Sequence, residues 1–200
     1  GNMLFDMKEV TKELALTTGG VRDGWAHSDQ YITRTNEEGF AGMSPEQIAP
    51  FLGHFNGGVA NGAEHALAKY GERALPILKS CINDTHPGVR AGAVDTLTLI
   101  YSSQTEEPRT EIPEELKSVI KLVRPRLSDE SQLVRASVGK FVVELNVVND
   151  DICDMLETLA RQGANIDGFA RYKVKDPATR VRLCMAIVDG CNKRLDTTPG

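Results

Sequence analysis

The sequence lacks most of the features by which enzymes, metal proteins and membrane proteins are identified. Aromatic residues make up 6% of its 200 residues, and no apolar run approaches the roughly 20 residues of a membrane-spanning helix. Its four cysteines form no CxxC pair, which excludes a zinc ribbon and a thioredoxin-like motif. GxGxxG, Walker, HExxH and GxSxG patterns are also missing. We therefore predict a protein without catalytic residues, cofactor, metal site or membrane span.

Charge and composition indicate a soluble globular chain. Hydrophobic residues make up 40% and charged residues 26%, and the net charge of −5 disfavours general phosphate binding. The order Gly1-Asn2-Met3 indicates a cleavage scar followed by part of a longer gene product. We expect either a cytoplasmic protein or an exported one whose signal peptide has been removed.

Three segments of the chain repeat one pattern, in which an Asp is followed five residues later by Val and then by Arg. The segments are DTHPGVRAGA from Asp84, DESQLVRASV from Asp129 and DPATRVRLCM from Asp176. They are 45 and 47 residues apart, a period typical of stacked repeats.

Apolar residues at helical spacing flank each of these segments. Before the Asp they are Ala74, Leu75, Ile77, Leu78, Cys81 and Ile82; Leu116, Val119, Ile120, Val123 and Leu127; Ile152, Met155, Leu156 and Leu159. After the Asp they are Val89, Ala93, Leu97 and Ile100; Val134, Val138, Phe141 and Leu145; Val181, Met185 and Val188. The repeating unit is therefore predicted to be helix, tight turn, helix. A weaker copy begins at Gly58, and its leading helix is predicted from Ser44 to Phe55 by the start signal Ser-Pro-Glu-Gln.

The segment ALPILKSCINDTHPGVRAGAVDTLTLI, from Ala74 to Ile100, resembles a HEAT repeat in its first-helix Pro76, its inter-helix Asp and its Val-Arg pair. The resemblance extends over roughly Ser44 to Leu195. It implies an all-α fold, an α-α superhelix of about four helical hairpins at about 44–71, 72–102, 113–146 and 149–194. Residues 1–43 are expected to form a helix and an irregular cap or linker, and 196–200 a tail.

The resemblance also implies a role for the repeated charges. In HEAT proteins the Asp and Arg join neighbouring repeats in a polar ladder, a role that falls here on Asp84, Arg90, Asp129, Arg135, Asp176 and Arg182. A residue type used three times at the same place is expected to be structural.

Three stretches interrupt the pattern and are candidate functional segments. The first contains Trp25 and His27, which either bind a ligand or cover the end of the repeats. The second, from Tyr101, is predicted to be a plain solvated loop.

The third interruption, from Gly163 to Asp176, is longer than the other inter-helix turns and carries Arg171, Tyr172, Lys173 and Lys175. Eight Lys/Arg against three Asp between Arg161 and Arg194 give this region a net charge of +5. It either attracts an anionic ligand or forms a short helix, Ile166 to Val174, whose Phe169 and Tyr172 pack on the last repeat.

Cysteine and histidine positions support no metal or disulfide site. Cys184 and Cys191 are two helical turns apart, and all four cysteines, including Cys81 and Cys153, are predicted to be buried free thiols. His54 and His65 fit no metal-binding spacing.

The predicted function is a non-catalytic binding scaffold, whose groove holds a protein or a neighbouring domain of the same chain. Exposed positions expected in that groove are Asp95, Thr98, Lys140, Glu144 and Asp189. The alternative is a nucleic-acid binder or HEAT-like DNA glycosylase that uses the basic last repeat, which the acidic net charge disfavours.

Overall fold

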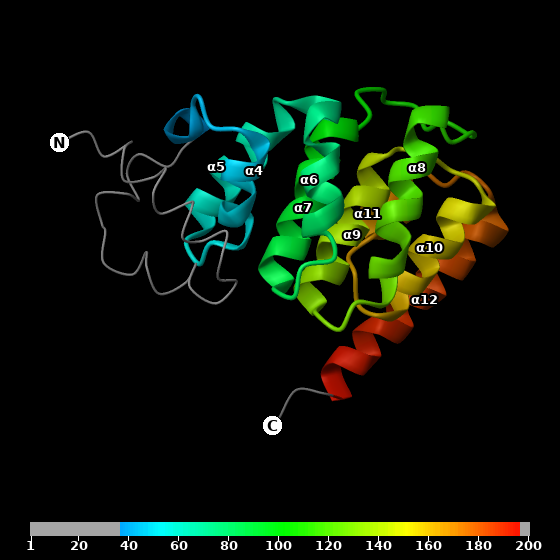
Figure 1. Cartoon of the computed structure of the whole chain (residues 1–200). Coiled ribbons are helices and arrows are strands. Elements are labelled where there is room, and N and C mark those ends of the chain that lie inside the picture. Colours follow the sequence, from blue (N-terminus) through cyan, green and yellow to red (C-terminus); the bar gives the residue numbers. More distant parts are fainter. Residues whose placement is uncertain (1–36, 197–200) are drawn as a thin grey trace. The chain divides into compact units, whose positions relative to one another are not determined.

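A computed structural model describes residues 37–196 of the chain, and helices make up most of this part (Figure 1). They contain no β-strand, and the one extended pairing among them is an isolated bridge between Arg109 and Val147. None of the helices in this part of the chain combines the length and apolarity needed to cross a bilayer. The chain consists of two compact units, and the boundary between them lies between Ile100 and Tyr101.

From Glu37 onward, the described part of the first unit holds seven helical elements in chain order. They are η1 (Glu37–Phe40), α4 (Pro45–Ile48), η2 (Ala49–Gly53), α5 (Gly57–Ala68), η3 (Gly71–Ala74), α6 (Leu75–Cys81) and α7 (Pro87–Tyr101), which ends at the boundary. The predicted start at Ser44 is confirmed, because its hydroxyl accepts from the N–H of Gln47 and its own N–H donates to the Gln47 side chain at 2.9 Å. The predicted single helix to Phe55 is wrong. Pro50 lacks an N–H and obstructs the preceding turn, and the chain continues as the 3-10 helix η2.

Glycine permits the close contact between α7 and η2 within this unit. A Cβ atom on Gly92 would lie 2.9 Å from the carbonyl oxygen of Leu52, so only a residue without a side chain allows this approach. The core around the contact contains fully buried Phe51, Leu67 and Leu78.

The second unit holds the remaining elements. They are α8 (Glu114–Val123), η4 (Arg124–Ser128), α9 (Gln132–Glu144), α10 (Asp150–Arg161), α11 (Asp167–Tyr172) and α12 (Pro177–Asp196). In this unit α9 packs on η4 and α10, and α10 lies alongside α12, as the yellow and red helices of Figure 1 show. A Cβ atom on Gly190 would lie 1.9 Å from the carbonyl oxygen of Ala160, so α12 meets the end of α10 backbone to backbone.

The connection that precedes α8 is bonded to the turn between α9 and α10. Asn146, which adopts a left-handed conformation with φ of 51°, donates from its amide to the carbonyls of Thr105 at 2.7 Å and Glu107 at 3.1 Å. Arg109 donates its N–H to the Asn146 carbonyl and accepts from the N–H of Val148. The predicted solvated loop is present, with residues 104–107 exposed, but its backbone is also held by partners about 40 residues away, which the sequence did not indicate.

Candidate binding surface on the last helix

The first two repeated Asp-Val-Arg segments form the same turn. Asp84 accepts from the N–H of His86 at 2.7 Å, and the Arg90 guanidinium donates to the carbonyls of Asp84 and Thr85 at 2.9 and 3.1 Å. In this arrangement the carboxylate supports the start of the second helix, and the arginine satisfies two carbonyls of the turn between the helices.

The second copy reproduces these contacts. Asp129 accepts from the N–H of Ser131 at 2.9 Å, and Arg135 donates to the carbonyls of Asp129 and Glu130 at 2.6 and 3.0 Å. Arg126 adds an ion pair to Asp129 at 3.1 Å. In these two turns, whose geometry agrees, the repeated Asp and Arg thus stabilise the turn itself by bonding its own backbone groups.

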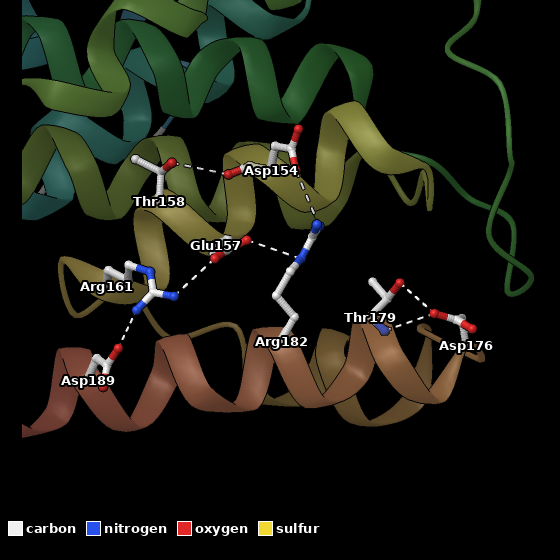
Figure 2. Close-up of polar contacts among 8 residues, drawn as sticks. All are labelled: Asp154, Glu157, Thr158, Arg161, Asp176, Thr179, Arg182 and Asp189. Atoms are coloured by element: carbon white, nitrogen blue, oxygen red, sulfur yellow. Dashed lines mark hydrogen bonds and ion pairs between the residues drawn. The ribbon is translucent and has the colours of Figure 1, made fainter.

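The third copy departs from this geometry, as Figure 2 shows. Asp176 accepts from the hydroxyl and the N–H of Thr179 at 2.7 and 2.8 Å, and these hydrogen bonds hold the pKa of Asp176 below its ordinary value. In this copy the arginine that donates to a backbone carbonyl is Arg180, and the carbonyl is that of Val174. Arg182, which the sequence pattern aligns with Arg90 and Arg135, is displaced from the turn.

Arg182 instead pairs with carboxylates of α10. It lies 3.3 Å from Asp154 and 3.1 Å from Glu157, and Arg161 bonds both Glu157 and Asp189 (Figure 2). This ion-pair network joins α10 to the side of α12 that faces it. It therefore orients α12, and it neutralises two of the cations that the sequence assigned to a basic region.

The predicted anion-binding residues do not converge on one site. Arg171 pairs with Asp167 at 3.1 Å, and the ammonium of Lys173 donates to the carbonyl of Glu106. Tyr172 and Lys175 are exposed. The predicted short helix is present as Asp167–Tyr172 with Phe169 buried, but the predicted packing of Tyr172 is wrong because that ring faces solvent. Trp25 and His27 lie outside the described residues.

An apolar stripe runs along α12 on the side turned away from the core. Val181, Met185 and Val188 are 58, 61 and 56% exposed, and Leu195 is exposed beside them. Cys184 and Cys191 lie on the same side and are exposed, so the prediction that all four cysteines are buried is wrong for these two. We call these six residues the outer stripe. Leu183, Ala186 and Gly190 are the buried residues of the opposite side, and the last of them meets α10.

The positions of Val181, Met185 and Val188 in the outer stripe are core positions in the two earlier copies of the repeat. The residues at the same distance from the repeated Asp are Val89, Ala93 and Thr96 in α7, and Val134, Val138 and Phe141 in α9; each of them is no more than 8% exposed. The prediction that Val181, Met185 and Val188 are core residues is therefore wrong. In α12 the core pattern is present but nothing among the described residues covers it.

Basic residues are present near both ends of α12. Arg180 precedes Val181, and Lys193 and Arg194 precede Leu195, and all three are exposed. Arg180 is held by its hydrogen bonds to the Val174 carbonyl and forms no ion pair with a described residue. Asp189, the acidic side chain of α12 that the structure describes, is engaged by Arg161.

The groove positions expected from the sequence are not all accessible. Lys140, Glu144 and Asp189 are exposed and Asp95 is half-buried, but Thr98 is buried and donates to the carbonyl of Val94 at 3.0 Å. A side chain that is 4% exposed is not accessible to a partner. The prediction is therefore wrong for Thr98.

The first unit contains a cleft whose walls are mostly apolar. It has a volume of about 580 Å³ and is lined by Phe40, Ile48, Ala66 and Tyr70 with Lys69 and Arg73 at its edge. His54 is buried and stacks on Phe55, and burial lowers its pKa from 6.5 to about 4. Among residues 37–196 no cluster of three metal-ligating side chains is present.

The outer stripe could have been found from the sequence, because α12 carries apolar residues on two sides. Leu183 and Ala186 form one row, and Val181, Met185 and Val188 form another. A helix that is apolar on two sides must be covered on both or expose one.

Comparison of the chain with family models, with curated proteins and with solved structures finds no match.

Proposed function

We propose that the chain is a non-catalytic binding module of the HEAT-like helical-repeat kind, which holds a protein partner on the outer stripe of α12. The repeat architecture is supported by the all-helical fold and by the agreement of the Asp84 and Asp129 turns. In such arrays each helical pair supplies a face that the following pair covers. A last face left uncovered is then available to a partner.

The exposure of the outer stripe is the observation that carries this proposal. Full burial of a Val, Leu or Met side chain contributes roughly 1.5–3 kcal/mol. Scaled by their exposed fractions, the four large apolar residues of the stripe offer about 4–7 kcal/mol. Association itself costs about 4–15 kcal/mol in lost freedom of motion, so the stripe needs additional contacts to form a stable complex.

Nucleic-acid binding, including that of a HEAT-like DNA glycosylase, is the weaker proposal. The basic last repeat supports it by composition, with its net charge of +5 between Arg161 and Arg194. However, Arg161, Arg171 and Arg182 are each paired with carboxylates of the same unit. Cations that are already paired attract phosphate less, so their number overstates the attraction.

The proposal is tested by reconstitution of a complex from pure components. The chain is used to isolate a partner from the cells that express it, and the identified partner is then purified and mixed with the chain in sedimentation experiments. Val188→Glu places a charge on the outer stripe and should abolish the complex. Leu133→Glu is the matched control, since Leu133 in α9 is also 56% exposed and lies outside the stripe.

Both variants should retain the helical circular dichroism spectrum of the unmodified chain, because each replaces an exposed side chain. A complex that survives Val188→Glu unchanged would refute the assignment of the surface. Salt-dependent binding of labelled duplex DNA, without a protein partner, would instead favour the nucleic-acid alternative.

A further inference from the structure

We propose that Asn56 is a site of spontaneous deamidation in the folded chain, at which the cap of α5 is converted to an aspartate or an isoaspartate. The co-reactant is water, and no enzyme is required. The inference is independent of the binding surface on α12, because α5 belongs to the first unit. It is carried by the glycine that follows Asn56, by the place of that glycine in the helix, and by the contacts of the Asn56 amide.

The reaction takes place within the dipeptide Asn56-Gly57. The backbone nitrogen of Gly57 attacks the amide carbon Cγ of Asn56, a bond forms between these two atoms, and the bond from Cγ to the amide nitrogen breaks. That nitrogen leaves as ammonia, with the proton that the Gly57 nitrogen loses. Water then opens the cyclic imide at one of its two carbonyl carbons, which gives aspartate or isoaspartate. Glycine favours the attack because it has no Cβ to shield its nitrogen.

The fold leaves the nitrogen of Gly57 available for this attack. Gly57 is the first residue of α5, where the helix supplies no acceptor for the N–H. It is exposed, and a Cβ atom built on it would meet nothing within 4 Å. Water therefore reaches the reacting nitrogen, and no backbone hydrogen bond of the helix has to break first.

The hydrogen bonds of the cap also favour the attack. Asn56 Oδ1 accepts from the N–H of Gly58 at 2.9 Å and from the N–H of Val59 at 3.4 Å. Negative charge collects on this oxygen when Cγ becomes tetrahedral, and N–H donors that are already directed at it stabilise that charge. The positive end of the helix dipole lies at the same place and acts in the same direction. The contacts that make Asn56 a cap thus also activate its amide carbon.

A second Asn-Gly pair in the same helix lacks both advantages. Asn61-Gly62 lies inside α5, and Gly62 is buried. Within a helix each N–H donates to the carbonyl four residues earlier, so this nitrogen can attack only after the helix opens locally. The loss of one such hydrogen bond slows the reaction by about tenfold. The two pairs therefore form a matched comparison within one molecule.

The two products should affect α5 differently. Aspartate caps a helix as well as asparagine does, and its charge is favoured at the positive end of the dipole. In isoaspartate the main chain runs through the former side chain, so the side-chain oxygen that accepted from Gly58 and Val59 becomes part of the backbone. The cap is then lost beside Val59, whose side chain is completely buried. Loss of a cap should lower the Tm of a unit of this size by about 4–8 °C.

The test is a time course of the full chain, kept near neutral pH and well below its Tm. Fragment-ion mass spectrometry measures the conversion of amide to acid at Asn56 and at Asn61, in the native chain and in urea. In urea the two sites should convert at similar rates, because both are Asn-Gly pairs without structure. In the native chain Asn56 should convert at least about tenfold faster than Asn61.

Gly57→Ala is the variant that isolates the chemistry. It should suppress conversion at Asn56 and leave Asn61 unchanged, because its methyl group shields the attacking nitrogen. The fold should tolerate it, since the added Cβ meets nothing within 4 Å. The comparison of Asn56 with Asn61 in the unmodified chain does not depend on this variant.

The effect on the cap is measured on the separated products. Anion exchange isolates the chains that have gained a charge, and electron-based fragmentation distinguishes aspartate from isoaspartate. The isoaspartate form should melt about 4–8 °C below the unmodified chain. Asn56→Asp reproduces the other product and should melt at the same temperature as the unmodified chain or slightly above it.

Three results would overturn the inference. Equal rates at Asn56 and Asn61 in the native chain would mean that the start of the helix gives no advantage. An Asn56 that stays intact in the native chain but converts in urea would mean that the cap protects the amide. An isoaspartate form that melts with the unmodified chain would refute the effect on the cap. None of these results bears on the outer stripe, which is tested separately.

Discussion

Gly190→Ala should destabilise the second unit, because it introduces a side chain where α12 touches α10. Its Cβ would lie 1.9 Å from the Ala160 carbonyl oxygen and 3.0 Å from the Gly163 nitrogen. Backbone atoms cannot rotate away, so α12 must move outward by roughly 1.5 Å, which loosens the packing of Leu183 and Ala186 as well.

Two opposing effects set the size of this change. Overpacking of a close contact costs about 1–3 kcal/mol, and the clash with backbone places this site at the upper end of that range. Alanine favours the helix over glycine by about 1 kcal/mol. We therefore expect a net loss of about 2 kcal/mol, or a fall in Tm of about 4–8 °C.

Thermal unfolding followed by circular dichroism measures the effect, with Gly168→Ala as the control. Gly168 lies in α11 of the same unit, and a Cβ there meets nothing within 4 Å. The Tm of the control should match or slightly exceed that of the unmodified chain. Its free energy of unfolding should be higher by up to about 1 kcal/mol. If Gly190→Ala is as stable as Gly168→Ala, α10 and α12 do not approach as closely as described.

Three further outcomes are expected. Arg135→Ala should lower the free energy of unfolding by about 1.5–3 kcal/mol in urea titrations, since it leaves two turn carbonyls without their charged donor, whereas exposed Lys140→Ala should change it little. Burial lowers the pKa of His54 from 6.5 to about 4, so as the pH falls the unfolded chain protonates this imidazole before the folded chain does. Stability should therefore fall as the pH decreases from 6.5 to 4, and His54→Asn should flatten that slope; an unchanged slope would contradict the assignment. In the native chain a thiol reagent should modify two cysteines rapidly and two only after unfolding; the rapid pair is Cys184 and Cys191, the slow pair Cys81 and Cys153.

Features fixed by neighbouring residues could be predicted from the sequence. The capping box at Ser44 and the turns at Asp84 and Asp129 depend on side chains that bond backbone groups a few residues away. A short pattern contains all that such a contact requires. For the same reason the helical nature of α9 and α10 followed from their apolar spacing.

Features fixed by distant residues could not be predicted in the same way. The orientation of α12 depends on Gly190 against Ala160 and on Arg182 against α10, and neither contact is visible in the local pattern. The Asp-Val-Arg motif is intact at Asp176, yet its arginine, Arg182, pairs with carboxylates of α10 and does not bond the carbonyls of the turn. Val181, which the motif alone assigns to the core, is 58% exposed in this copy.

The bridge between Arg109 and Val147 has a consequence for limited proteolysis. A protease must draw several residues of extended backbone into its cleft, and here the N–H and the carbonyl of Arg109 are both occupied by the α9–α10 turn. Trypsin should therefore spare the Arg109–Thr110 peptide bond while the second unit is folded. Cleavage there would report that the connection before α8 has detached from the turn between α9 and α10, before any loss of helix is visible in the spectrum.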